Sequence, residues 1–118
     1  MKNLAPEIMR KRILIEGFYD LEVNEKVIKD FYSEITSKLS LRVYGEPIIH
    51  ATSGQGKEIN EGYDAFVPLI DSGIYLGVWA NKSFLSLILY TCKDFDSNKA
   101  VEITKRFWKI KKIARKVF

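Results

Sequence analysis

The sequence predicts one α/β (α+β) domain, a two-layer sandwich in which an antiparallel five-stranded sheet carries two helices on one face. Three observations predict this fold. The chain has 118 residues, which is the size of one domain. Short apolar runs separated by turn residues indicate strands, and two segments with apolar residues at helical spacing indicate helices. We expect a β-α-β-β-β-β-α order over residues 1–118, without a linker or a repeat.

The first strand is predicted over residues 11–18 (KRILIEGF), which are rich in branched apolar side chains. Asn24 is a plausible N-cap for the helix that follows. Its apolar side chains recur at helical spacing with Lys and Glu between them: Val27, Ile28, Phe31, Ile35 and Leu39. This segment is therefore predicted to be an amphipathic helix.

Four further strands are predicted in the middle of the chain. Residues 41–51 form the second strand, in which Pro47 indicates an edge position or a bulge because proline cannot donate to the ladder. The glycine-rich residues 52–62 form a loop. Three short apolar runs at 63–70, 74–79 and 84–91, separated by 71–73 and 80–83, then predict an antiparallel meander.

A last helix is predicted to begin at Asp96 or Ser97. Its apolar stripe would be formed by Ala100, Ile103, Phe107, Ile110, Ala114 and Val117. Of the 19 Lys and Arg residues, eight lie between Lys99 and Lys116, so the net charge of +4 reflects a local excess. We interpret the basic side of this helix as a solvated face, and a nucleic-acid partner is not expected.

The strand at 84–91 is apolar on both faces, because Phe84, Ile88 and Tyr90 alternate with leucines. Two helices cover only one face of the sheet, and a large apolar patch on the other face is typical of an interface. A homodimer packed sheet against sheet is therefore predicted. A loop that folds back over this face is the alternative.

Composition restricts the chemistry further. Cys92 is the only cysteine and His50 the only histidine, so a zinc site built from cysteines or a His-rich metal site is not expected. No apolar run is long enough to span a bilayer, and the first residues lack the apolar region of a signal peptide. The sequence therefore predicts a cytoplasmic protein that uses no metal and has no membrane partner.

The stretch Asp71-Ser72-Gly73-Ile74, followed by Trp79 and then by Tyr90-Thr91-Cys92, resembles the core of the prokaryotic S-adenosylmethionine decarboxylases. Their pattern is Glu-Ser-His-Ile, then His-Thr-Trp-Pro-Glu, then an aromatic residue with Thr-Cys. The two patterns align without a gap, and the resemblance marks this chain as a divergent member of that family.

The resemblance implies that the chain makes its own cofactor. The Ser72 hydroxyl would attack the carbonyl of Asp71, the chain would break between the two residues, and Ser72 would become a pyruvoyl group. This group would accept the electrons released when an amine substrate loses carbon dioxide, and Cys92 would return a proton. By resemblance, the substrate is S-adenosylmethionine and the pathway is polyamine (spermidine) biosynthesis.

Five positions depart from the family pattern. Asp71 replaces the glutamate before the cleavage point, and Gly73 and Gly77 each replace a histidine. Ala80 replaces a proline, and Asn81 replaces the glutamate that would hold the substrate's ribose. Because the histidine at the position of Gly77 assists self-processing in the family, we expect slow or absent self-cleavage. Two alternatives follow: an unprocessed, non-catalytic or regulatory relative, or a pyruvoyl decarboxylase for a different amino acid.

Other readings of the same residues remain open. Without the resemblance, Ser72 is a turn residue and Cys92 a small buried hydrophobe. Asn81, at the place of the ribose-holding glutamate, and Glu16, in an otherwise apolar strand, are weaker candidates for binding the substrate. The acidic side chains of Glu58, Glu61 and Asp64 could position an amine or act as a base, but solvated loop charges are the simpler interpretation.

Overall fold

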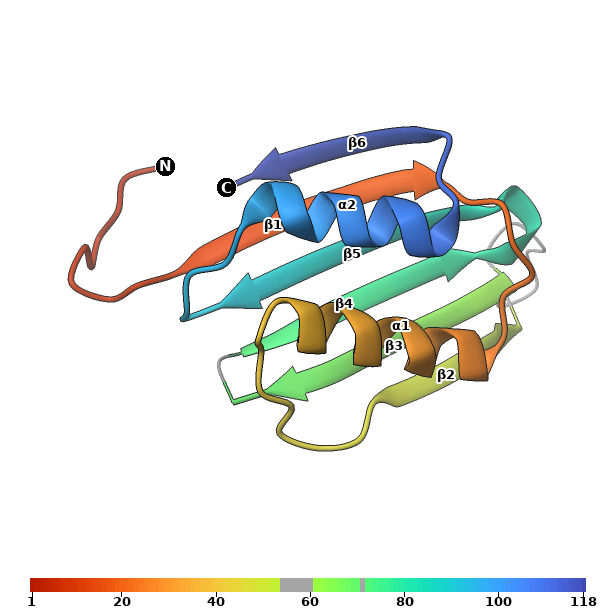
Figure 1. The fold of residues 1–118 in the computed structure, drawn as a ribbon, viewed down its shortest axis with the longest axis horizontal. Helices are drawn as coiled ribbons and strands as arrows, with labels where there is room; N and C mark the ends of the chain where they lie inside the picture. Colours follow the sequence, from red (N-terminus) through yellow and green to blue (C-terminus); the bar gives the residue numbers. More distant parts are fainter. Residues whose placement is uncertain (54–60, 71) are drawn as a thin grey trace.

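A computed structural model of the chain describes residues 1–53, 61–70 and 72–118. The elements that it contains are shown in Figure 1. In chain order they are β1 (Lys11–Phe18), α1 (Glu25–Lys38), β2 (Ile48–Ser53), β3 (Glu61–Leu69), β4 (Ser72–Trp79), the 3₁₀ turn η3 (Ala80–Lys82), β5 (Phe84–Thr91), α2 (Ser97–Trp108) and β6 (Lys112–Val117).

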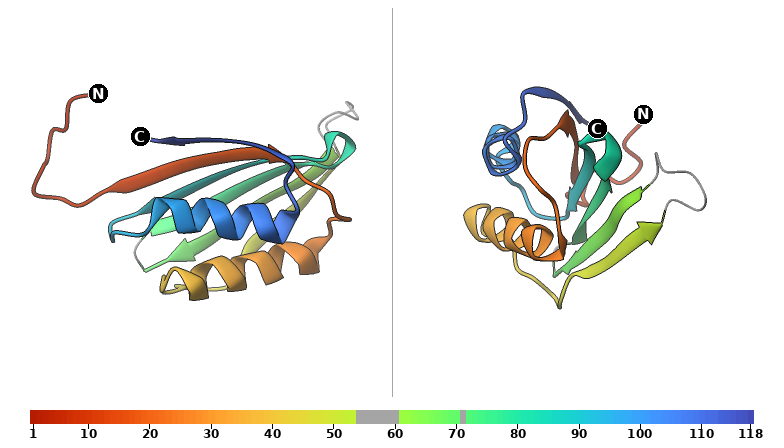
Figure 2. Two further views of the ribbon diagram at one scale, coloured as in Figure 1. Left: turned by 45° about the horizontal axis from the view of Figure 1, so that its top comes forward. Right: turned by 90° about the vertical axis from the view of Figure 1, so that its right-hand side faces the viewer.

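The strands form one sheet in the order β2-β3-β4-β5-β1-β6, and every neighbouring pair is antiparallel. Both helices lie on the same face of this sheet, as the two views in Figure 2 show. The predicted two-layer α+β sandwich is therefore confirmed.

The core lies between the helices and the sheet. Strand side chains alternate between the two faces, so Leu85, Leu87 and Leu89 of β5 are fully buried against the helices. From the helix side, Phe31 and Trp108 meet edge to face, with ring centroids 5.5 Å apart. This face is a dense apolar interior.

The predicted helix starts are confirmed. The Asn24 side chain accepts a hydrogen bond from the Val27 backbone N–H at the start of α1, at 2.9 Å. The Asp96 side chain likewise accepts from the Lys99 N–H at the start of α2, at 3.1 Å.

The predicted end of the last helix is wrong, and the sheet has six strands instead of five. The α2 helix ends at Trp108, Lys109 adopts a left-handed conformation (φ 53°), and β6 then pairs with β1. Gly17 makes this return possible, because a Cβ atom there would lie 2.6 Å from the Ile110 side chain. Helical periodicity alone could not reveal that β1 had an unpaired edge.

The second predicted strand, residues 41–51, is shorter in the structure. Only Ile48–Ser53 form β2, while Val43 makes an isolated bridge to Leu69. The intervening Gly45, Glu46 and Pro47 lie outside any strand, and β2 is an edge strand, as Pro47 suggested.

The sheet face away from the helices, called here the open face, carries large apolar side chains. It comprises Leu14, Phe18, Phe66, Tyr75, Trp79, Phe84, Ile88 and Tyr90, all of which alternate with buried core residues along their strands. Several of them are well exposed, including Phe18 (49%), Phe66 (40%) and Tyr75 (40%). In the part of the chain that the structure describes, no helix is long and apolar enough to cross a membrane.

Candidate active site

Ser72 is the first residue of β4 and has an unusual backbone. Its φ angle is 139°, in a region that residues with side chains rarely adopt. It is nevertheless held between two strands, opposite Leu69 of β3 and Thr91 of β5. A strained residue fixed by its surroundings is typical of functional sites.

Cys92 follows directly after β5, and its thiol is free and exposed. Because Ser72 pairs with Thr91, the last residue of β5, the residue that follows Thr91 lies beside Ser72. The Ser72 Oγ and the Cys92 Sγ are 3.4 Å apart. The structure thus brings together the two side chains that the sequence singled out, and Cys92 is not the buried hydrophobe of the alternative interpretation.

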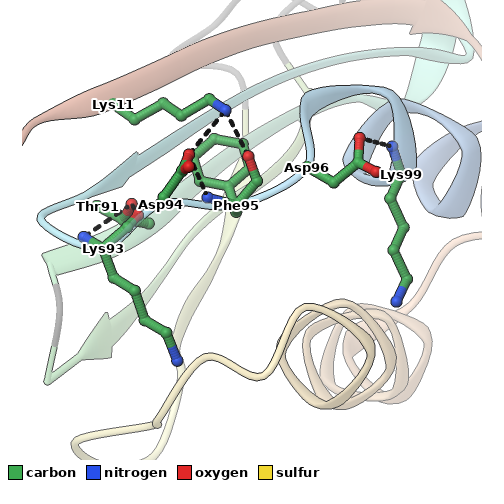
Figure 3. A network of polar contacts seen from close by, with 7 residues as sticks. All are labelled: Lys11, Thr91, Lys93, Asp94, Phe95, Asp96 and Lys99. Atoms are coloured by element: carbon green, nitrogen blue, oxygen red, sulfur yellow. Dashed lines mark hydrogen bonds and ion pairs between the residues drawn. The ribbon is translucent and has the colours of Figure 1, made fainter.

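A network of polar contacts fixes the turn after Cys92 (Figure 3). The Lys11 ammonium of β1 lies 3.0 Å from the Asp94 carboxylate and also donates to the Phe95 carbonyl. The Thr91 hydroxyl donates to the Lys93 carbonyl. This network ties the segment that carries Cys92 to the sheet, and the Lys11 ammonium lowers the pKa of Asp94.

A shallow hollow of about 350 Å³ on the open face adjoins Ser72. Its walls are Phe66, Gly73, Tyr75, Ile88 and Tyr90. Gly73 is the position where the family pattern has a histidine, and a Cβ atom there would lie 2.4 Å from the Phe66 ring. The ring therefore fills the space that a side chain at residue 73 would occupy, and the site next to Ser72 is apolar.

Gly77 lies near the centre of the open face, beneath other side chains. A Cβ atom at Gly77 would lie 3.2 Å from the Trp79 ring and 3.2 Å from the Tyr75 hydroxyl. That hydroxyl donates to Asp64 Oδ1 at 3.0 Å. Burial first, and then Asp64, raises the pKa of Tyr75.

Sequence reasoning did not identify Tyr75 and gave Asp64 only a minor place. Tyr75 belongs to an ordinary alternating strand, and its partner comes from a different strand. The β3–β4 register, which places Asp64 opposite Gly77, is the feature that would have indicated the Tyr75–Asp64 pair. That register depends on a turn whose length the sequence did not fix.

Of the remaining predicted site residues that the structure describes, Glu16 and Asn81 lie away from Ser72 within one chain. Glu16, on β1, accepts a hydrogen bond from Ser86 at 2.7 Å in the middle of the open face. Asn81 lies in η3, beyond the opposite end of β4 from Ser72. Asp71, the residue before the predicted cleavage point, and Glu58 lie outside the described residues. Glu61 is exposed at the start of β3.

No metal centre is formed by the residues that the structure describes, since no group of three or more His, Cys, Asp or Glu side chains is placed to hold an ion. The basic residues at the end of the chain lie on the turn after α2 and on β6, and not on a helix as predicted.

Comparison with known proteins supports the fold. Neither a protein-family model nor a curated protein matches the sequence. Among solved structures, the chain matches the adenosylmethionine decarboxylase from Aquifex aeolicus VF5 with a TM-score of 0.74. The match covers 94% of this chain and 89% of that one, at 16% sequence identity.

Two helices on one face of an antiparallel sheet are thus an architecture that this chain shares with that solved structure. More particularly, the chain has the fold of an adenosylmethionine decarboxylase. At this identity the likeness establishes the fold, and the activity has to be argued from the site.

Proposed function

We propose that this protein is a pyruvoyl-dependent decarboxylase of the S-adenosylmethionine decarboxylase type, which cleaves itself between Asp71 and Ser72. One observation carries the proposal: the strained Ser72, at φ 139°, lies with its Oγ 3.4 Å from the free thiol of Cys92. S-adenosylmethionine is the first candidate substrate, and polyamine synthesis in the cytoplasm is the corresponding role.

The residues around Ser72 fit a pyruvoyl group at this position. Ser72 begins a strand, so a chain break before it would leave the sheet pairing of Gly73 and the following residues in place. The neighbouring hollow leaves space beside residue 72 for a substrate. When present, a pyruvoyl ketone supplies an electron sink for the decarboxylation of an amine.

Self-processing would proceed through three balanced changes. The Ser72 Oγ forms a bond to the Asp71 carbonyl carbon as the C–N bond breaks, and the hydroxyl proton moves to the nitrogen. Loss of the Ser72 Cα proton then releases the Asp71 carboxylate by elimination. Water finally replaces the nitrogen as ammonia and leaves a ketone at residue 72. The backbone strain at Ser72 favours the first change, because breaking the chain relieves it.

Cys92 is proposed to hold a proton for the catalytic cycle. Its Sγ lies close enough to the Ser72 Oγ to reach a substrate atom bound at residue 72. A thiol at this distance can act as a general acid toward carbon once carbon dioxide has left. The turn fixed by Lys11 keeps the thiol in this position.

We further propose that a second copy of the chain covers the open face. Exposed Phe18, Phe66 and Tyr75 form an apolar surface of the kind that interfaces bury. Sheets that pack face to face lie about 10 Å apart, so side chains of both copies would fill the layer between them. Glu16 and Asn81 stay candidates for substrate contacts from across this interface.

Intact-mass spectrometry under denaturing conditions tests the processing. During prolonged warm incubation, we expect the chain to convert to two fragments, one ending at residue 71 and one beginning with a carbonyl group at residue 72. The matched control is Ser72→Ala, which should stay intact. A wild-type chain that remains whole and gives no carbonyl-reactive fragment would contradict the proposal.

A second candidate is a relative that keeps the fold and never cleaves itself. The observation that favours it is Gly77, where the family histidine is absent and the Trp79 ring lies over the space. For such a protein, both the wild type and Ser72→Ala would keep their full mass throughout the incubation. A pyruvoyl decarboxylase of another amino acid would instead cleave and then fail to release carbon dioxide from S-adenosylmethionine.

A further inference from the structure

The position of the missing histidine is not empty on the open face. Any side chain at Gly77 would begin 3.2 Å from the Tyr75 hydroxyl and 3.2 Å from the Trp79 ring. Of these two neighbours, only the Tyr75 hydroxyl can both donate and accept a proton, because an indole N–H is a donor only. The hydroxyl thus brings a proton-transferring group to the place where the family pattern has an imidazole.

Asp64 fixes the direction of this hydroxyl. Asp64 faces Gly77 across the β3–β4 pair, and its Oδ1 accepts the Tyr75 O–H at 3.0 Å. Because Gly77 has no side chain, it places nothing between the Tyr75 hydroxyl and the Asp64 carboxylate. On its other side Asp64 is opposite His50 of β2. The hydroxyl and the carboxylate form a two-member proton chain at the surface.

We propose that Tyr75 and Asp64 replace the absent histidine as the proton shuttle for self-cleavage, acting on Ser72 of the partner subunit. This inference rests on the proposed function, because it concerns the same cleavage at Asp71-Ser72.

Strand geometry requires the shuttle to act between two copies. Gly77 is five residues along β4 from Ser72, which is about 16 Å at the usual rise of about 3.3 Å per residue. The Tyr75 ring lines the hollow beside Ser72, but its hydroxyl is held at Gly77 by Asp64 and so lies at the far end of this distance within its own chain. A two-fold axis that lies in the layer between two packed open faces and crosses β4 near Tyr75 would place Gly77 of one copy over Ser72 of the partner subunit. The region around Tyr75 and Ile88 is also the exposed apolar centre of the open face.

The proton balance of the first step is then complete. As the Ser72 oxygen attacks the Asp71 carbonyl, its proton passes to the Tyr75 oxygen while the Tyr75 proton moves to Asp64. When the C–N bond breaks, the pair returns one proton to the Ser72 nitrogen. Tyr75 and Asp64 end as they began, and no further reactant is needed. Burial and Asp64 raise the pKa of Tyr75, so the hydroxyl is protonated at neutral pH when the step begins.

The first experiment measures the rate of self-cleavage by intact mass. We expect Tyr75→Phe to slow cleavage about 10²-fold, in line with the usual contribution of a general acid–base group. The matched control is Tyr44→Phe, which removes a hydroxyl from an exposed tyrosine outside the sheet and should cleave at the wild-type rate. Asp64→Asn should slow cleavage as much as Tyr75→Phe, and the double variant no further, because the two groups act as one unit. Unchanged thermal unfolding midpoints would show that the variants fold.

The second experiment tests action between copies. Ser72→Ala cannot be cleaved but keeps its tyrosine, while Tyr75→Phe keeps its serine. When the two are co-expressed with different tags, we expect the Tyr75→Phe chain to regain cleavage. Equal cleavage of wild type and Tyr75→Phe, or no rescue in the mixed dimer, would overturn this inference while leaving the proposed function intact. A wild-type chain that never cleaves would overturn both.

Discussion

The two faces of the sheet are built from the same strands and differ in almost every physical respect. On β5, Leu85, Leu87 and Leu89 are fully buried under the helices, whereas Ile88, between two of them, remains 36% exposed. The helix face is closed mainly by aromatic and aliphatic side chains, and its buried Tyr32 and Thr36 hydroxyls donate to backbone carbonyls. The open face carries Ser72, Asp64, Tyr75 and the Glu16–Ser86 pair among its aromatic side chains.

This difference separates stability from chemistry within a single strand. Residues that hold the fold point one way, and residues that could react or bind point the other way. Sequence change on the open face can therefore alter a reaction without unfolding the chain, which agrees with a shared fold at 16% identity.

The largest expected contrast is between neighbouring residues of β5. Leu87→Ala should lower the free energy of unfolding by about 2–5 kcal/mol, because it opens a cavity in the core. Ile88→Ala should lower it by less than about 1 kcal/mol in the isolated chain, since its side chain is already partly solvated. Urea denaturation at low protein concentration measures both.

If the two variants lost equal stability, the open face would be covered in the single chain and the contrast between the faces would fail. As a control, the unfolding midpoint of the wild type is measured at several protein concentrations, because a dimer makes this midpoint depend on concentration.

A second prediction concerns the proposed dimer. Ile88→Glu places a charge at the centre of the open face and should raise the dissociation constant at least about tenfold, because a buried unpaired carboxylate costs several kcal/mol. Sedimentation at micromolar concentration should then show monomers. The exposed Val43→Glu, remote from this face, is the matched control and should leave the dimer intact.

Most of the fold was predictable from the sequence because its signals are local. The bounds of β1 and β5 and the caps Asn24 and Asp96 depend on residues within a few positions of one another. The sixth strand was not predictable in this way. Ile110 and Val117 fit a helical stripe, and only the free edge of β1 makes 112–117 a strand.

The same division applies to the candidate site. The spacing of Ser72 and Cys92 indicated their proximity through a family pattern, and the structure places their side chains in contact. Asp64 and Tyr75 meet only through the β3–β4 register, and Glu16 meets Ser86 through the β1–β5 register. Neither register follows from residue type, because a shift of two positions keeps every side chain on the same face.

A smaller effect is expected at Glu16, the acidic residue in the centre of the open face. Ser86→Ala removes the hydrogen bond to its carboxylate and should lower the free energy of unfolding by about 1 kcal/mol. The matched control is Ser37→Ala on the exposed face of α1, whose hydroxyl bonds only its own helix. A Ser86→Ala variant as stable as the wild type would show that water replaces the hydroxyl at no cost.

The smallest expected effect is a pH dependence at the turn after Cys92. The Lys11 ammonium lowers the pKa of Asp94 in the folded chain, so this ion pair stabilises the fold at neutral pH. That contribution should be lost as the pH falls through the lowered pKa, because the unfolded chain takes up the proton first. Lys11→Met should remove this part of the acid dependence of the unfolding midpoint. Asp94 is fully exposed, so the shift should be small and should shrink in high salt. An acid dependence identical in the variant and the wild type would contradict this assignment.

The place of β1 in the sheet has a consequence for how the chain is made. Among the strands of this sheet β1 is made first, yet both its neighbours, β5 and β6, come from the last third of the given sequence. Lys11 pairs with Thr91, so at about 5–20 residues per second the first strand waits several seconds for its partner. During that time its apolar side chains Ile13 and Ile15 have no sheet to join. The nascent chain therefore exposes this apolar segment longest, and the cations Lys11 and Arg12 at the start of β1 oppose its aggregation until the sheet closes.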